Sequence, residues 1–216
     1  MPTQTMERIL KKRVLPAVII HDANDALPLA DAMLKAGMDV VEITFRTPAA
    51  EDAIRRIAAR YPHMLLGAGT VLSEDQLKRA ADAGCRFSVA PGLSPAIVGL
   101  ARELHVLHVP GTVTPTEIES AMSAGCKLLK FFPADAMGGA RTLKALAGPY
   151  AHTGIKFVPT GGSNAANASE FLAIPIVGAV GGSWMVAEKL IKEKNWPEIS
   201  RLCMEAVTIC ATVHKG

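Results

Sequence analysis

The feature that most restricts the possible folds of this chain is a recurring unit. In this unit an amphipathic helix pattern ends at Ala-Gly, and a short apolar strand pattern follows within a few residues. It occurs at Ala36-Gly37, Ala83-Gly84 and Ala124-Gly125. Glycine adopts the left-handed conformation that ends a helix, which explains its place in the unit. Because the spacing is irregular, we interpret the units as successive helix-to-strand joints rather than a solenoid.

Short apolar runs and amphipathic patterns alternate along the whole chain. We predict strands at 14–20, 40–45, 64–69, 86–90, 105–109, 127–132, 155–159 and 176–180. Helices are predicted at 24–36, 48–60, 73–83, 94–103, 114–123, 139–146, 164–172 and 184–193, with another after Pro197. Two of them begin at capping signals, Ser73 with Gln76 and Thr114 with Glu117.

Strands and helices that alternate at these lengths predict parallel βαβ units. Eight such units predict an α/β fold, a (β/α)₈ TIM barrel formed as a single domain by residues 1–216, with extra helices at the N- and C-termini. The structural alternative is a doubly wound open sheet. We favour the barrel because the count is eight and no dinucleotide-binding glycine pattern follows the first strand.

Composition excludes several classes of protein. Half of the 216 residues are hydrophobic and the net charge is only +3, which excludes intrinsic disorder. The basic residues are scattered, which argues against nucleic-acid binding, and the apolar runs are too short to span a membrane. The N-terminus has no secretion-signal pattern, and the four cysteines have no C-x-x-C spacing. We therefore expect reduced thiols and a cytoplasmic protein.

Polar residues stand where several predicted strands end. Alternation places Glu42 and Arg46 on the inward row of the second strand and Lys130 on the inward row of the sixth. Thr70 and Thr160 follow the third and seventh strands, with Thr70 assigned to the row of Leu66 and Ala68. The carboxyl ends of barrel strands carry the active site in enzymes of this architecture, so we expect these side chains to converge there.

Lys130 is the strongest catalytic candidate. It lies in the apolar run 128–132, where burial disfavours the ammonium form. A neutral lysine attacks carbonyl carbons and forms Schiff bases. The alternative is a buried Lys130–Glu42 ion pair that only fills the interior, but such pairs seldom repay their desolvation, so we favour a chemical role.

Two glycine pairs predict an anion site. Gly161-Gly162-Ser163 follows the seventh strand and Gly181-Gly182-Ser183 follows the eighth, each before a predicted helix. Backbone amides at such places bind phosphate, although Gly-Gly also forms ordinary turns. The strand-end position of Arg46 suits bidentate capture of a carboxylate. His105 and His108 lack accompanying carboxylates, so we interpret them as ordinary, partly buried histidines rather than metal ligands.

Taken together, six segments resemble one family. They are VEITFRT at 41–47, GAGTVL at 67–72, PGL at 91–93, KFFPA at 130–134, PTGG at 159–162 and GGSW at 181–184. In this order they resemble the 2-keto-3-deoxy-6-phosphogluconate (KDPG) aldolases, which are class I, Schiff-base enzymes. One departure is Ser163, at a position where the family usually has an apolar residue.

The resemblance implies a role for each matching residue. Lys130 would form the Schiff base, and Glu42 would transfer protons. Arg46 and Thr70 would hold the pyruvate carboxylate beside Lys130. The phosphate would be held by Gly161, Gly162, Gly182 and Ser183, and the pocket would be shaped by Phe132, Thr160 and Pro91. The resemblance also implies a phosphorylated 2-oxo sugar acid as substrate, a homotrimer, and no metal or organic cofactor.

Three other functions remain as alternatives. The nearest is cleavage of 4-hydroxy-2-oxoglutarate or of the galactonate epimer; Arg46-Thr47 and Phe131-Phe132 argue against a galactonate enzyme. A metal-dependent phosphosugar epimerase would need a His/Asp ligand set that the sequence does not offer. A non-catalytic phosphate-binding barrel would have no use for Lys130 and Glu42.

Overall fold

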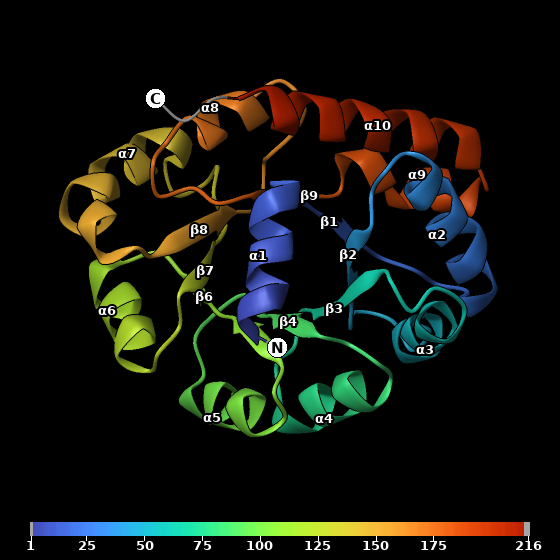
Figure 1. The fold of residues 1–216 in the computed structure, drawn as a ribbon, viewed down its shortest axis with the longest axis horizontal. Coiled ribbons are helices and arrows are strands. Elements are labelled where there is room, and N and C mark those ends of the chain that lie inside the picture. The colour runs from blue at the N-terminus through green and yellow to red at the C-terminus, as the bar shows by residue number, and fades with distance from the viewer. Residues whose placement is uncertain (1, 214–216) are drawn as a thin grey trace.

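The computed structural model describes residues 2–213, in which parallel strands are surrounded by helices (Figure 1). The strands are β1 (Val14–Val18), β2 (Val40–Thr44), β3 (Leu65–Gly69), β4 (Phe87–Val89), β5 (Leu107–Val109), β6 (Gly111–Thr112), β7 (Leu128–Phe131), β8 (Lys156–Pro159) and β9 (Val180–Gly182). The longer helices are α1 (Pro2–Lys12), α2 (Ala26–Lys35), α3 (Ala50–Arg60), α4 (Glu74–Asp82), α5 (Pro95–Glu103), α6 (Pro115–Ser123), α7 (Gly139–Tyr150) and α10 (Trp196–Thr212).

The strands form a curled, all-parallel arrangement in two sheets. One sheet has the order β5-β4-β3-β2-β1-β9 and the other β6-β7-β8. An isolated bridge joins Phe157 of β8 to Val177, and another joins Thr160, just after β8, to Gly181 of β9 and so connects the two sheets. The predicted α/β class with parallel strands is therefore confirmed, and the chain has the alternation of strand and helix that the sequence indicates.

Two strand predictions need correction. The predicted fifth strand continues after a break, because Pro110 lacks an N–H and separates β5 from β6. The predicted eighth strand, 176–180, was placed too early: β9 begins at Val180 and contains Gly181 and Gly182. The sequence places the two glycines after the strand, but in the structure they lie within β9 and pair with β1.

Alternation along the strands divides the core into two layers. Val41 and Ile43 pack in the layer between strands and helices, whereas Val40 joins the interior cluster with Ile9, Phe87 and other apolar side chains. Leu129 and Phe131 alternate with Leu128 in the same way. The inward rows predicted for β2 and β7 are thus confirmed, and they place Glu42 and Lys130 on the interior face.

The row predicted for β3 is wrong. Leu66 and Ala68 pack against the helices, so the interior-facing residues of this strand are Leu65, Gly67 and Gly69. Thr70 would follow Leu66 and Ala68 outward if the strand continued. The strand ends at Gly69, however, and Thr70 has a left-handed backbone with φ 55°, which redirects its side chain.

Helix ends agree with the predicted capping signals. Ser73 Oγ accepts from the Gln76 amide, and Thr114 forms a complete capping box with Glu117. The extra terminal helices are present: α1 lies over one end of the strands, and α10 packs at the periphery (Figure 1). No helix within residues 2–213 is long and apolar enough to cross a bilayer. The four cysteines are free, and three of them are buried.

The α-helices that follow the two glycine segments are shorter than predicted and begin further along the chain. After β8, helix α8 (Ala168–Leu172) begins well beyond Gly162. After β9 the chain forms a 3₁₀ turn, η3 (Trp184–Val186), and then α9 (Glu188–Lys192). The glycine segment after β8 therefore does not lead directly into a helix, and any anion held there meets loop amides instead.

Packing in the interior excludes a side chain at Gly67. A Cβ atom at Gly67 would lie 2.1 Å from Cε2 of Phe87, whose ring is fully buried in the interior cluster. Real carbon atoms do not approach this closely, so the ring occupies the space that a side chain on β3 would need. Gly67 and Phe87 thus fill one layer of the interior together.

We predict that Gly67→Ala lowers the free energy of unfolding by about 1–3 kcal/mol, the usual cost of overpacking, as measured by urea denaturation. Replacing the ring in the double variant Gly67→Ala/Phe87→Leu should recover part of that loss, because the pair is in contact. Gly99→Ala is the matched control, since a Cβ at Gly99 in α5 meets nothing within 4 Å. Equal destabilisation at both glycines would contradict the packing argument.

Candidate functional site

A cavity of about 170 Å³ opens at the carboxyl ends of the strands. Its walls are formed by Ala17, Ile19, Glu42, Thr44, Arg46, Lys130, Phe132, Thr160, Gly161, Gly162, Ser163, Gly182 and Ser183. These residues come from β1, β2, β7, β8 and β9 and the segments that follow them. Nine of the residues predicted from the sequence thus share one small volume.

Glu42 is almost completely buried in this cavity, with 3% of its surface exposed. A Cβ atom at Gly69, its neighbour on β3, would lie 2.0 Å from Glu42 Oε1, so the glycine makes room for the carboxyl group. Burial raises the pKa of Glu42 above its usual 4.5, while the charges of Lys130 and Arg46 oppose that rise. A carboxyl in this setting is suited to both giving and taking a proton.

Lys130 is held at the centre of β7. Its backbone N–H donates to Pro110 O at 2.8 Å, and the residue is 6% exposed. Its Nζ lies 4.8 Å from the centroid of the Phe132 ring, within the range of a cation–π contact. Phe132 therefore supports one side of the amine, and Lys130 lines the same cavity as Glu42.

Arg46 and Thr70 form a second polar feature at this end of the strands. Arg46 Nε donates to Thr70 Oγ1 at 3.3 Å, although Thr70 itself does not line the cavity. Within residues 2–213, the terminal guanidinium nitrogens of Arg46 make no hydrogen bond or ion pair. They are thus available to an anionic group in the cavity, and Thr70 fixes the orientation of the guanidinium from its edge.

The loop after β8 curves tightly around the cavity. Gly161 and Gly162 have φ values of 90° and 93°, a region that favours glycine. A Cβ atom at Gly162 would lie 2.3 Å from Cβ of Asp135, so this position has no room for a side chain. Within the described chain, the amides of Gly162, Ser163, Ser183 and Trp184 donate no hydrogen bond. Two chain segments thus offer N–H groups beside the same cavity.

Ser163 does not project into the cavity as a free hydroxyl. Its side chain is buried, and Oγ donates to Pro159 O at 3.2 Å. Asn164 and Asn167 both donate to Gly162 O, at 3.2 and 3.0 Å. These bonds hold the loop to the end of β8, so the polar residue at position 163 has a satisfied structural partner.

Two features of the site differ from the expectations. Pro91 does not line the cavity; its carbonyl oxygen lies where a Cβ atom of Gly111 would be, at 2.0 Å, so it packs beside β6. Gly182 lines the cavity from inside β9, where the ring of Trp184 covers its α-carbon. A linear motif cannot show these packing relations.

Apart from Ser163 in the predicted glycine segment, three lining residues were not predicted as site residues. Ala17 and Ile19 have no polar group that could have marked them. Thr44 could have been predicted from strand alternation, since it lies on the same inward row as Glu42. Its Oγ1 donates a hydrogen bond to Val18 O at 2.9 Å and so connects β2 to β1. The two histidines have different settings, His105 exposed and His108 buried. Residues 2–213 contain no group of three His, Cys, Asp or Glu side chains that could hold a metal.

Comparison with known proteins identifies relatives with similar sequences and folds. A family model for the KDPG and KHG aldolases matches residues 6–202. The chain is 45% identical over 206 residues to the 2-dehydro-3-deoxy-phosphogluconate aldolase of Haemophilus influenzae, covering 95% of this chain and 96% of the relative. It is 39% identical to the KHG/KDPG aldolase of Escherichia coli over 90% of each chain.

A solved structure agrees with both. The KDPG aldolase of Legionella pneumophila, with pyruvate captured at low pH as a covalent carbinolamine intermediate, superimposes with a TM-score of 0.89 at 37% identity. The match covers 95% of this chain and 98% of that one. With the match of the family model over nearly the whole sequence, these similarities show that the chain belongs to the KDPG and KHG aldolase family.

Proposed function

We propose that this chain is a class I aldolase that cleaves 2-dehydro-3-deoxy-6-phosphogluconate to pyruvate and glyceraldehyde 3-phosphate. The observation that supports it most is the presence of buried Lys130 and buried Glu42 in one cavity. The relatives named for this reaction, and the carbinolamine captured in the Legionella enzyme, support the same chemistry.

The reaction begins at the ketone. Lys130 Nζ attacks C2 of the substrate, and Glu42 transfers protons as the carbinolamine loses water to form an iminium. The opposing influences on Glu42 suit this role, because burial favours its protonated form while Lys130 and Arg46 favour its charged form. A carboxyl balanced in this way can act as an acid in one step and a base in the next.

The iminium then accepts the electrons of the C3–C4 bond. Loss of the C4 hydroxyl proton to a base releases glyceraldehyde 3-phosphate and leaves an enamine, with Glu42 as the base in this proposal. Protonation of the enamine at C3 and hydrolysis of the iminium release pyruvate and restore Lys130. The ring of Phe132 beside Nζ and Thr160 at the end of β8 shape the space in which the bond breaks.

Two anionic ends orient the substrate. Arg46, fixed by Thr70, binds the carboxylate next to C2, and the amides of Gly162, Ser163 and Ser183 bind the phosphate. Gly161 lets the loop turn, and Gly182 leaves space on β9. Holding both ends places the ketone against Lys130, which is the positioning contribution to the rate.

A second substrate follows from the family itself. The Escherichia coli relative is named for both KHG and KDPG, so we propose 4-hydroxy-2-oxoglutarate as an alternative substrate. It has the 2-oxo acid end that Arg46 and Lys130 engage and lacks the phosphate. Turnover of this compound should therefore depend on Lys130 and depend little on the glycine loop.

The domain organisation and the closure of the barrel are further parts of this proposal. We propose that residues 1–216 form one domain and that the two sheets close into an eight-stranded barrel, with β5 and β6 as one strand interrupted at Pro110. The bridge from Thr160 to Gly181 and the bond from Lys130 N–H to Pro110 O support closure on both sides. A homotrimer and a cytoplasmic location stay predictions.

The first test concerns the covalent step. Borohydride reduction in the presence of pyruvate should attach a stable adduct to Lys130 and to no other lysine, as mapped by peptide mass spectrometry. Lys130→Met should yield no adduct and no KDPG cleavage. Lys127→Met, three residues earlier and exposed, is the matched control that should keep both. An adduct on a different lysine would refute the Schiff-base assignment.

A second prediction distinguishes a role of Glu42 in proton transfer from a purely structural role. Glu42→Gln keeps the side-chain shape but cannot titrate, and a well-placed general acid or base contributes about 10²–10⁴ in rate. Exchange of the pyruvate methyl protons with deuterated solvent, followed by NMR, should slow by that factor. If the exchange proceeds at the wild-type rate in a folded Glu42→Gln protein, Glu42 has no role in proton transfer.

The third prediction concerns the phosphate loop. Gly162→Ala should collide with Asp135 and displace the loop amides, raising KM for KDPG by about tenfold or more while sparing pyruvate methyl-proton exchange. Gly154→Ala is the matched control, because Gly154 has a similar φ of 77° but its Cβ would meet nothing within 4 Å. Equal losses for KDPG and 4-hydroxy-2-oxoglutarate would show that the phosphate binds elsewhere.

A further inference from the structure

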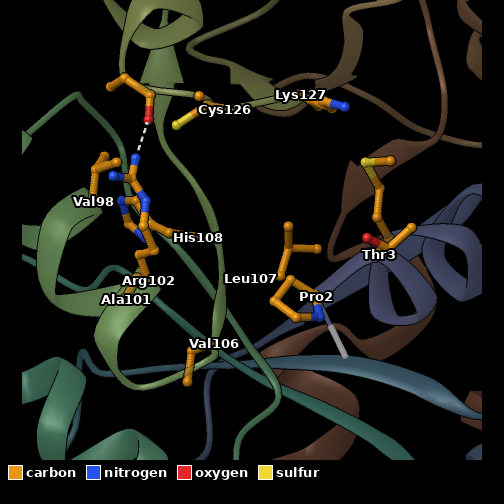
Figure 2. A pocket seen from close by; sticks show the side chains of 13 residues that line it. Pro2, Thr3, Val98, Ala101, Arg102, Val106, Leu107, His108, Cys126 and Lys127 are labelled. Atoms are coloured by element: carbon orange, nitrogen blue, oxygen red, sulfur yellow. Dashed lines mark hydrogen bonds between the residues drawn. The ribbon is translucent and has the colours of Figure 1, made fainter.

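Hydrogen-bond donors at the two ends of the strands are used differently. In the cavity of about 250 Å³ beside α1, α5 and β5, Arg102 is engaged within the protein, because its terminal nitrogen donates to Ala124 O at 2.7 Å (Figure 2). At the carboxyl ends of the strands, by contrast, the backbone amides of Ser183 and Trp184 donate no hydrogen bond within the described chain. Ser183 lines the cavity that contains Lys130, and Trp184 follows directly. The orientation of these two free amides therefore matters for any anion held there.

The side chain of Trp184 does not line this cavity but packs behind its wall. A Cβ atom at Gly182 would lie 2.3 Å from Cζ3 and 2.4 Å from Cε3 of the indole, so the ring occupies that side of β9. Val180, two residues earlier and on the same side of the strand, packs in the layer between strands and helices. The indole thus folds back over the end of β9 on the side that faces away from the interior.

The segment that follows β8 reaches the same place. The carbonyl oxygen of Ser163 lies 3.2 Å from the point where a Cβ atom of Gly182 would be, on the side that the indole occupies. The two segments that offer free amides, 162–163 and 183–184, therefore meet beside the ring of Trp184. A single side chain is thus placed where it can fix one segment relative to the other.

The contact between the indole and Gly182 also restricts the backbone that carries the free amides. The chain leaves β9 at Ser183, with φ −113° and ψ 1°, and enters the 3₁₀ turn η3. Val186 N–H donates to Ser183 O at 3.0 Å, and the buried side chain of Met185 attaches the turn to the core. Because η3 is attached on one side and the indole lies against Gly182 on the other, the N–H groups of Ser183 and Trp184 are held in a fixed orientation.

Fixed amides bind an anion better than mobile ones. Backbone N–H groups recognise phosphate when several of them converge on one point. If they had to be ordered during binding, the entropy of ordering would reduce the affinity. A rigid side chain that sets the direction of two such amides therefore contributes to phosphate affinity without touching the phosphate.

We propose that Trp184 is a positioning residue for the phosphate end of the substrate. Its ring, packed on Gly182 beside Ser163 O, holds the amides of Ser183 and Trp184 in register with those of segment 162–163. Trp184 does not line the cavity, so the Schiff-base chemistry at Lys130 does not depend on it. This inference rests on the proposed function, since it assigns a residue to the phosphorylated end of KDPG.

The kinetic test compares Trp184→Leu, which removes the ring but stays apolar, with Trp184→Phe, which keeps an aromatic ring against Gly182. Trp184→Leu should raise KM for KDPG by about tenfold or more and leave kcat within about twofold, because the affected hydrogen bonds hold the substrate far from the reacting carbon. Trp184→Phe should recover most of this loss. Trp196→Phe, at the start of α10 and likewise half-buried, is the matched control and should behave as the wild type.

Reactions without a phosphate distinguish positioning from a purely structural role. Pyruvate methyl-proton exchange and turnover of 4-hydroxy-2-oxoglutarate should proceed at wild-type rates in Trp184→Leu. If both fall in proportion to kcat/KM for KDPG, or if KM for KDPG is unchanged, the proposal is overturned. Gly182→Ala, which places a methyl group against the ring and displaces it, should give the same selective rise in KM and decides the question if Trp184→Leu fails to fold.

A binding measurement distinguishes failure of this inference from failure of the proposed function. Glycerol 3-phosphate has a phosphate but no 2-oxo group, and glycerol is the matched probe without phosphate. Calorimetric titration should show that the wild-type protein binds glycerol 3-phosphate and not glycerol, and that Trp184→Leu binds it about tenfold or more weakly. Equal affinity of the two proteins, or no binding by the wild type, would overturn the role of Trp184 even if KDPG is cleaved. Selective weakening in a protein that does not cleave KDPG would support that role and refute the proposed substrate.

Discussion

The confinement of two buried ionisable groups in one small cavity is the constraint on which the rest of this structure depends. Glu42 and Lys130 stand on the inward rows of β2 and β7, directly beyond the layers filled by apolar side chains such as Leu128 and Val40. Burial of a carboxyl is unfavourable unless it is neutral or compensated. Its raised pKa means that ionising Glu42 costs stability as the pH rises through that value, and Lys130 and Arg46 offset part of the cost.

Neighbouring glycines are what allow this confinement. Gly69 lacks a side chain where the Glu42 carboxyl lies, and Gly67 lacks one where the Phe87 ring lies. Gly111 likewise leaves room for the backbone of Pro91. Each contact joins residues on different strands or loops. Glycine is thus required at interior positions where a large neighbouring group fills the space of a side chain. The polar cavity lies next to a closely packed apolar layer.

The sequence predicts the parts of this arrangement that depend on local periodicity. Alternation on β2 and β7 is enough to place Glu42 and Lys130 inside, and the caps at Ser73 and Thr114 begin their helices where expected. The resemblance supplied roles that spacing alone could not. The predictions that were wrong depend on tertiary contacts. Thr70 leaves the alternation of β3 because the strand ends at Gly69, and Gly182 is part of β9 because it pairs with β1. Neither event has a signature within a few residues of sequence.

The proposed chemistry depends most directly on the protonation state of Glu42 in the free enzyme. Its carboxyl can be followed by infrared difference spectroscopy against Glu42→Gln as the pH is varied, because the protonated and ionised forms absorb at different frequencies. We predict that the protonated band persists above pH 4.5, the ordinary pKa of this side chain. A carboxyl that ionises at or below pH 4.5 would contradict the claim that burial outweighs the charges of Lys130 and Arg46.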